Sequence, residues 1–579
     1  MNNKILIFLT LAFLATSCSD VFEPAIENNR SLEAAYKEAT YAEGILLNGY
    51  IRVPTNGWSF NDVATDDAVS NDNNSAYRNI ATGQWAANYN PVSQWQNSRA
   101  AIQYLNIFLA EADNVAWSTD EEIRDLYNRR LKGEAYGLRG LHMYYLLQAH
   151  AGIGQSGELL GIPIVLEPEN PSSDFNTSRA TFAQSMEQLY SDLNNAEEML
   201  PLDFSSIDDS GQLPDGFGGV NEYNRVFGDF GKQRMSGRIA KAIKAQAALL
   251  AASPAFNSSS STTWEMAAQY AGEVLALNGG ISGIAPDGNT WYNNASQING
   301  LGGGANPPEI LWRTDVGQST DLEQQHFPPT LYGNGRLNPT QNLVNAFPMV
   351  NGYPIDDAAS GYDPNNPYEN RDPRLKDYIV VNQGSIGNNT VITAADGSTI
   401  DALNRAETST RTGYYMRKLL RQDVNLNPNT TNPQLHYKPR IRYTELYLIY
   451  AEAANETWGP RGTGINGFSA YDVISGIRQR AGITQPDEYL ESIGSDQDAM
   501  RELIKNERRL ELCFEGFRFW DLRRWGNDLT EPARGVSILD GNHQTITVEN
   551  RVYEEYMQYG PVPFSEVLKY EALIQNQGW

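Results

Sequence analysis

Apolar residues recur at helical spacing along much of this chain, and this periodicity limits the folds that it can adopt. The clearest case is the segment 125–152, where the spacing is mostly three, four or seven residues, at Leu126, Leu131, Leu138, Leu141 and Tyr145. Such spacing places the side chains on one face of a helix that is buried against its neighbours. The chain is therefore expected to be dominated by packed helices.

The helical stretches repeat without a strict period. Helices are predicted over residues 31–50 and 264–277, from residue 237 to a stop at Pro254, and in several segments after residue 435. The stretch "WEMAAQYAGEVLAL" contains part of the tetratricopeptide pattern Trp-x2-Leu-Gly-x2-Tyr. Because no repeat of about 34 residues runs through the chain, we interpret these segments as degenerate helix hairpins within one large domain.

Residues 281–434 differ in composition from the helical segments and are rich in Gly, Asn and Pro. These residue types favour turns and loops, and short strands are expected only at "EILWRT" and "DYIVV". So long an irregular stretch inside a compact domain is usually functional. We expect a helical scaffold over about 30–280 and 435–530, interrupted by this loop-rich part.

The first residues are typical of an export signal that ends at a cysteine. Lys4 precedes an apolar run, residues 5–15, that is about half as long as a membrane-spanning helix. Small residues then lead directly into Cys18, as in bacterial lipoprotein signals. We predict a signal peptide at 1–17, a lipid on Cys18 and a mature chain over 18–579. The alternative is an ordinary cleaved signal with an incidental cysteine.

The other cysteine, Cys513, lies in a segment with helical periodicity. With Cys18 carrying lipid, an intramolecular disulfide is impossible, because the chain has two cysteines. We expect Cys513 to be a small apolar core residue.

Composition narrows the ligand class. The formal net charge of −26 argues against nucleic acid, whose phosphates require a basic surface. The chain holds 31 Tyr and 11 Trp in a polar background. Aromatic side chains with polar tips suit surfaces that bind neutral polar molecules.

No motif for catalysis or metal binding is evident. The five histidines are scattered, and neither a Gly-x-Ser-x-Gly elbow nor a phosphate-binding loop occurs. The acidic run "TDDAVSNDNN" lacks the spacing of a calcium loop, so we interpret it as a solvated loop. We expect no cofactor, with a structural calcium ion at this run as the open alternative.

The segment "NERRLELCFEGFRFWDLRRW" admits two interpretations. Glu507, Glu511 and Glu515 recur at four-residue steps, with Arg508, Arg509 and Arg518 nearby. Paired carboxylates would suit glycoside cleavage. Arginines would instead hold the pKa of these carboxyls low, which makes poor general acids. We favour a partly buried ion-pair network that fixes helix packing.

Several motifs follow one another in an order that resembles the RagB/SusD family of starch-utilisation-type outer-membrane lipoproteins. They run along nearly the whole mature chain: "SCSDVFEP", "ATDDAV", "KGEAYGLRGLHMYYLL", "GIPIV", "RATF", "NRDPRL", "TGYYMRK", "IRYTELYLIYAEAANE", "IRQRAG", "ERRLELCFEGFRFWDLRRWG" and "YGPVPFSEVLKYEALIQNQGW". One departure is "AHAGIGQSGELLG", which replaces the usual glycine-glycine turn of the family.

The resemblance implies an all-α fold of tetratricopeptide-like helix pairs, on which a loop-rich part carries the binding surface. It implies a lipid-anchored protein on the outer face of the outer membrane that binds oligosaccharide and delivers it to a SusC-like TonB-dependent barrel transporter. Members of the family are not enzymes. The alternatives are a secreted helical glycoside hydrolase, which would release products from glycans, and a scaffold that binds only protein.

The sugar site is expected among aromatic residues that loops leave exposed, because pyranose rings lie flat on aromatic faces. This criterion excludes Trp520, Trp525 and Trp312, which lie in helical or strand-like runs. It selects Trp291 and Tyr292, Tyr332, Trp85, Tyr89 and Trp95. Trp291 is the strongest candidate, and its replacement is expected to weaken binding without lowering the melting temperature.

Overall fold

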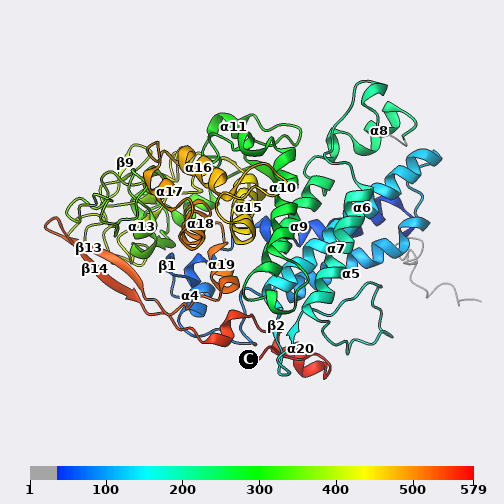
Figure 1. Cartoon of the computed structure of the whole chain (residues 1–579), viewed down its shortest axis with the longest axis horizontal. Helices are drawn as coiled ribbons and strands as arrows, with labels where there is room; N and C mark the ends of the chain where they lie inside the picture. Colours follow the sequence, from blue (N-terminus) through cyan, green and yellow to red (C-terminus); the bar gives the residue numbers. More distant parts are fainter. Residues whose placement is uncertain (1–35, 215–216) are drawn as a thin grey trace, which may run out of the picture.

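The computed structural model describes residues 36–214 and 217–579, and it is predominantly helical (Figure 1). The long helices of the first half are α3 (Ala39–Ile51), α5 (Trp95–Glu111), α6 (Glu121–His150), α7 (Phe182–Met199), α9 (Gly237–Ala252) and α10 (Trp264–Leu277). Later in the chain come α15 (Tyr443–Trp458), α16 (Ala470–Ala481), α18 (Gln497–Glu511) and α19 (Arg518–Trp525). Most of these helices share the largest hydrophobic core of the described residues.

The longest of them, α6, shows why these segments are helical. The Asp120 side chain caps its first turn by accepting from Ile123 N at 3.1 Å, and Glu121 and Glu122 follow there, where acidic groups suit the helix dipole. The four leucines of its predicted stripe are buried, and Tyr145 is half-buried. Glycine at position 133 lets α7 approach closely, because a Cβ there would lie 2.8 Å from the Cβ of Met199.

The loop-rich part carries only short elements. Its helices are α11 (Ala295–Asn299), α12 (Asp321–His326), α13 (Gln341–Ala346) and α14 (Pro373–Tyr378), and the remaining short helices of the chain are α4 (Ala76–Ala81), α8 (Val220–Phe227), α17 (Glu488–Ile493) and α20 (Phe564–Lys569). A second hydrophobic core lies beneath these loops and is rich in tyrosine, with Tyr378, Tyr414 and Tyr415 fully buried.

Short antiparallel strand pairs hold the loops in position. Within the described residues they are β1 (Ala68–Ser70) with β6 (Leu337–Pro339), β2 (Gly152–Ile153) with β3 (Leu159–Leu160), β4 (Ile310–Arg313) with β12 (Pro439–Arg442), β5 (Gly317–Ser319) with β11 (Gln434–His436), β7 (Ile379–Val380) with β10 (Tyr415–Met416), β8 (Ser385–Ile386) with β9 (Asn389–Thr390) and β13 (Ala533–Leu539) with β14 (Asn542–Glu549). The strands expected in "EILWRT" and "DYIVV" are confirmed as β4 and β7. The β13–β14 hairpin extends along one end of the molecule (Figure 1).

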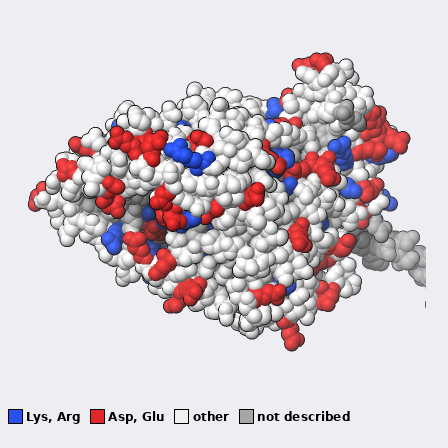
Figure 2. All heavy atoms as spheres, in the orientation of Figure 1, with Lys and Arg blue, Asp and Glu red and all other residues white. Residues whose placement is uncertain are grey.

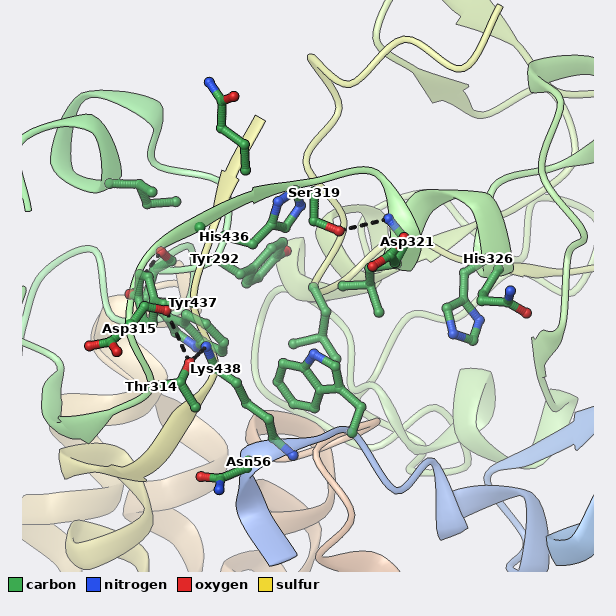
Figure 3. A pocket seen from close by; sticks show the side chains of 18 of the residues that line it. Asn56, Tyr292, Thr314, Asp315, Ser319, Asp321, His326, His436, Tyr437 and Lys438 are labelled. Atoms are coloured by element: carbon green, nitrogen blue, oxygen red, sulfur yellow. Dashed lines mark hydrogen bonds between the residues drawn. The ribbon is translucent and has the colours of Figure 1, made fainter. Parts of the chain in front are cut away.

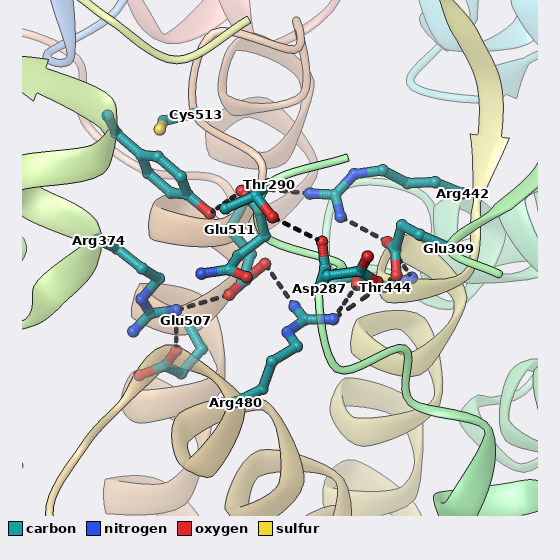
Figure 4. Close-up of polar contacts among 12 residues, drawn as sticks. Asp287, Thr290, Glu309, Arg374, Arg442, Thr444, Arg480, Glu507, Glu511 and Cys513 are labelled. Atoms are coloured by element: carbon teal, nitrogen blue, oxygen red, sulfur yellow. Dashed lines mark hydrogen bonds and ion pairs between the residues drawn. The ribbon is translucent and has the colours of Figure 1, made fainter. Parts of the chain in front are cut away.

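A buried ion network joins the loop-rich part to the helices (Figure 4). Nη1 of Arg374, in α14, donates to Glu507 at 2.8 Å and to Glu511 at 2.9 Å, and both carboxylates belong to α18. From α16, Arg478 reaches Glu507 at 2.9 Å and Arg480 reaches Glu511 at 2.7 Å. These carboxylates are fully buried, so the predicted structural ion network is confirmed.

Its partners differ from those expected. Instead of pairing with the glutamates of its own segment, Arg508 pairs with Asp521 at 2.7 Å. Arg509 and Arg518 both reach Asp66, at 2.8 and 2.9 Å. Asp66 belongs to the acidic run "TDDAVSNDNN". The expectation that this run is a solvated loop is therefore wrong at Asp66, which pairs with arginines. Proximity in the sequence did not identify partners that the fold brings from distant segments.

Cys513 is buried, and burial raises the pKa of its thiol to about 12, which fits the core role expected for it. The predicted signal peptide 1–17 and Cys18 lie outside the described residues. Among the residues that are described, no helix has the length and apolar character to cross a membrane. Acidic side chains are spread widely over the face seen in Figure 2, in keeping with the net charge of −26.

Candidate functional site

A cavity of about 420 Å³ opens where residues 56–60 meet the loop-rich part (Figure 3). Its wall is built by two strand pairs, since β4 pairs with β12 and β5 pairs with β11. This pairing holds residues 314–319 against residues 434–438, and α12 completes the wall. We call this cavity the Trp58 pocket, after the residue that covers one side of it.

Aromatic rings form the apolar surface of the Trp58 pocket. The half-buried Trp58 ring stacks on Trp291, with ring centroids 6.4 Å apart and planes inclined by 24°. Tyr292 and Tyr437 each meet the same Trp291 ring at 5.6 Å. Phe60 adds a ring 4.4 Å from His326. Such a surface suits a ligand with flat apolar faces.

Polar groups surround these rings, and two of them have no partner among the described residues. Nε1 of Trp291 and Nδ1 of His326 are buried without a hydrogen bond. Burial and the charge of Arg336 lower the pKa of His326 to about 3, so this ring is neutral. Since buried polar atoms are normally paired, each unpaired atom needs an explanation such as a ligand or a water molecule.

A second histidine of the pocket is fixed by a carboxylate. Nε2 of His436 lies 3.0 Å from Oε1 of the fully buried Glu323. Burial alone would lower the pKa of His436, but the hydrogen bond and the charge of Glu323 raise it above the usual value. At the mouth, Asp315, Gln318 and Asp321 are exposed, so hydrogen-bonding groups face solvent there.

Lys438 closes the pocket beside Trp58. Its Nζ donates to the main-chain oxygen of Gly57 and lies 4.3 Å from the centre of the Trp58 ring. Burial lowers the pKa of Lys438 to about 7. The contact holds the Trp58 loop against β12 and adds a cation–π interaction to the aromatic surface.

The structure brings together two of the six aromatic residues selected from the sequence. Trp291 and Tyr292 line the Trp58 pocket, but they are 2% and 4% exposed, so the expectation that they stand free on loops is wrong. They serve as the buried support of the pocket. The irregular segment that carries them folds over the second hydrophobic core.

The other four candidates lie outside this pocket. Trp85 and Trp95 are each 4% exposed, which again contradicts the expected exposure. Nε1 of Trp85 donates to Asn90, and its ring packs in a small core. Tyr89 and Tyr332 are exposed as expected, and a role for them in binding stays a prediction.

The sequence reasoning missed Trp58, Tyr437 and Lys438. Trp58 lies in "PTNGWSF", flanked by Gly, Asn and Ser, and meets the same criterion that selected the other loop aromatics. No comparable signal marks Tyr437 or Lys438, because they join the site only through the pairing of β5 with β11 and of β4 with β12.

Two family models match the chain. The SusD family model matches residues 308–579, and a model described as starch-binding and associating with the outer membrane matches residues 36–210. Curated relatives and solved structures that match the chain are also SusD-like. The chain belongs to the SusD/RagB family.

The curated relatives match over limited stretches. SusD-like protein P25 of Formosa agariphila is 38% identical over 164 residues, which are 28% of this chain and 27% of that protein. SusD-like protein P38 of the same organism is 30% identical over 122 residues, or 20% of this chain and 22% of that protein. The matched stretches thus span about a quarter of the length of these relatives.

Solved structures match the chain over nearly its whole length. A SusD-like protein from Bacteroides fragilis is 22% identical with a TM-score of 0.71, over 96% of this chain and 99% of that one. A SusD-like carbohydrate-binding protein from the same species is 21% identical with a TM-score of 0.67, over 93% and 99%. A laminarin-binding SusD-like protein is 20% identical with a TM-score of 0.58, over 94% and 100%. The predicted all-α, tetratricopeptide-like fold is confirmed.

Three buried carboxyls of this SusD/RagB chain, those of Asp62, Glu445 and Glu511, lie outside the Trp58 pocket. Charges of Arg480 and Arg374 oppose the effect of burial on Glu511 and lower its pKa to about 2. Burial raises the pKa of Asp62 and Glu445 to about 7, as a general acid requires, but neither lines the Trp58 pocket. No group of three or more His, Cys, Asp or Glu suited to a metal ion occurs among the described residues.

Proposed function

We propose that this protein binds an oligosaccharide in the Trp58 pocket and delivers it to a SusC-like TonB-dependent barrel transporter, without catalysing a reaction. The observation that carries the proposal is the stack of Trp58 on Trp291 inside a cavity of about 420 Å³. One sugar ring lies against the exposed part of the half-buried Trp58, whose ring Trp291 and Lys438 hold in position.

Polar groups would then read the sugar hydroxyls. The unpaired indole N–H of Trp291 and the neutral His326 offer hydrogen bonds inside the pocket. Asp315, Gln318 and Asp321 offer further oxygens and an amide at the mouth. This combination of an aromatic platform with a polar rim is what a saccharide requires.

Three further observations support this function. One matching family model is described as starch-binding and associating with the outer membrane. Two structurally similar proteins are described as carbohydrate-binding and as laminarin-binding. The signal-like first 17 residues lead into Cys18, which would carry the lipid that holds the protein on the outer face of the outer membrane.

A glycan-array screen followed by calorimetry tests the proposal. Trp58→Ala should weaken binding of the selected oligosaccharide by about tenfold, as expected for the loss of a stacking contact of roughly 1–2 kcal/mol. Phe564→Ala is the matched control, because it removes an exposed aromatic residue that lies outside the pocket and is not among the six candidates. Equal affinity in the wild type and in Trp58→Ala would contradict this site.

Chromatography of the same glycans after incubation separates binding from hydrolysis. Unchanged glycans are expected, and shortened products would favour the glycoside hydrolase instead. Recovery of a large β-barrel protein with the solubilised full-length chain would support delivery to a transporter. Its repeated absence would contradict that part of the proposal.

A further inference from the structure

A second cavity, of about 310 Å³, is basic although the chain as a whole is strongly acidic. Four cationic side chains line it, and the lining residues include one carboxylate, that of Asp315. The cations are Lys232, Arg234, Arg313 and Arg440. We call this cavity the arginine pocket.

Two of the four cations are already neutralised. Lys232 pairs with Asp229 at 2.7 Å, and Arg234 pairs with Glu43 at 2.9 Å and with Glu134 at 2.8 Å. Arg313 and Arg440 form no ion pair with any carboxylate among the described residues. The charge of the exposed Asp315 acts on both guanidinium groups. The arginine pocket therefore keeps an excess of positive charge.

Arg313 is the more deeply buried of the two, at 2% exposure. Its Nη1 donates to Thr314 O at 2.9 Å and its Nη2 to Ala305 O at 2.7 Å, while its Nε has no acceptor. Burial lowers the pKa of this guanidinium. A buried cation without an oppositely charged partner is costly, and a bound anion would reduce that cost.

The Arg440 guanidinium uses two of its three nitrogens, Nε and Nη1, in hydrogen bonds to the protein. Its Nε donates to Asn56 Oδ1 at 2.8 Å and its Nη1 to Arg313 O at 3.2 Å. The guanidinium lies 4.6 Å from the centre of the Trp312 ring. No hydrogen bond from Nη2 to another described residue is present. A guanidinium fixed in this way is ready to bind an oxyanion.

The arginine pocket adjoins the Trp58 pocket. Asp315 lines both cavities, and Asn56, which lines the Trp58 pocket, accepts the hydrogen bond from Arg440. On the other side, Tyr50 and Phe230 provide aromatic surface to the arginine pocket. One extended ligand can thus contact both cavities.

We propose that the arginine pocket binds the sulfate or carboxylate group of an acidic oligosaccharide whose neighbouring sugar lies on Trp58. This inference rests on the proposed function and narrows its ligand class to charged glycans. Arg313 and Arg440 bind the anionic group, and Asp315 limits the affinity by repulsion across the shared wall.

Calorimetry at constant ionic strength tests the inference with matched probes. These are a κ-carrageenan tetrasaccharide and its desulfated form, tetragalacturonate and its methyl ester, and inorganic sulfate. At least one acidic tetrasaccharide should bind about tenfold more tightly than its neutral counterpart, because a charge-assisted hydrogen bond is lost with the charge. Equal affinity within both pairs would overturn the inference.

Variants identify the residues that cause the tighter binding of the acidic form. Arg440→Gln should weaken binding of the acidic tetrasaccharide about tenfold, Arg440→Lys less, and Asp315→Asn should strengthen it. Arg405→Gln is the matched control, since it removes an exposed arginine outside both pockets. Because Arg313→Gln changes a buried residue, the half-buried Arg440 and the exposed Asp315 carry the test. No effect of either change would overturn the inference.

The outcomes separate the two proposals. If neutral and acidic forms bind equally and both depend on Trp58, the proposed function stands and the charged ligand class is wrong. If sulfate binds through Arg440 while no saccharide depends on Trp58, both the saccharide site and this inference fail. Tighter, Arg440-dependent binding of hexaglutamate would assign the arginine pocket to an acidic peptide and overturn the saccharide class.

Discussion

The rings of Trp58 and Trp291 stack 6.4 Å apart, although they come from segments that are far apart in the sequence. Trp58 is half-buried, and Trp291 is 2% exposed. Their roles therefore differ, because Trp58 can contact a ligand directly while Trp291 holds Trp58 in position.

Replacement of each tryptophan should separate binding from stability. Trp58→Ala should weaken glycan binding about tenfold and lower the melting temperature little. Trp291→Ala should lower the free energy of unfolding by about 3–5 kcal/mol, because it empties a large buried site. This result would replace the sequence-based expectation of an unchanged melting temperature. Calorimetry and thermal unfolding on each variant measure the two effects.

Trp85→Ala provides the buried control for this pair. Trp85 packs in a separate small core and does not line the Trp58 pocket. It should lose stability as Trp291→Ala does, while the folded protein keeps its glycan affinity. Loss of affinity in Trp85→Ala would place the binding surface near that core instead.

Two glycines in helices should respond to alanine in opposite directions. Gly133 of α6 is buried, and an added Cβ would lie 2.8 Å from Met199 Cβ and from Leu200 Cγ. Gly133→Ala should lower the free energy of unfolding by about 1–3 kcal/mol. Gly44 of α3 is exposed with open space around it, so Gly44→Ala should raise stability by roughly 0.5–1 kcal/mol. Chemical denaturation measures both, and equal effects would contradict the close approach of α6 and α7.

The buried ion network should make stability depend on acid pH. The folded pKa of Glu511 is about 2, below its ordinary value of 4.5. A carboxyl with a depressed folded pKa contributes stability above its unfolded pKa and loses it as the pH falls through the folded pKa. The free energy of unfolding should therefore fall between about pH 4.5 and pH 2, as measured by denaturation at several pH values.

Glu511→Gln tests the same network at neutral pH. It leaves Arg374 and Arg480 facing a neutral amide and should cost about 3–5 kcal/mol. Glu502→Gln on the same helix is the control, because Glu502 forms only an exposed pair with Lys505, which is worth about 0–1 kcal/mol. Similar losses of stability in the two variants would show that the buried network contributes no more to stability than an exposed ion pair.

Cys18→Ala should release the protein from the membrane without changing its fold. Cys18 follows the signal-like run and is one of two cysteines, and the other is buried. Fractionation of cells and circular dichroism measure attachment and folding. Continued acylation and membrane association of the variant would contradict the lipid anchor.

Helical periodicity predicted the scaffold well, because a stripe such as that of α6 is a local property of the sequence. The burial of Trp291 was not predictable from its polar neighbours, since it depends on Tyr437 and Trp58 from other segments. The same limit applies to Arg374, because Asp372 of its own segment is one partner but Glu507 and Glu511 lie on α18. A sequence pattern indicates the secondary structure of its own segment, but it does not identify the residues from other segments that pack against it.

The network around α18 also defines where this protein can be recombined with its relatives. Glu309 is anchored to Arg442 at 2.7 Å, and Arg374 is anchored to Glu507 and Glu511. Between these two anchors lie β5 and α12, which supply one wall of the Trp58 pocket. A chimera that exchanges only the residues between Glu309 and Arg374 would replace one wall of the Trp58 pocket and keep the ion pairs of α18.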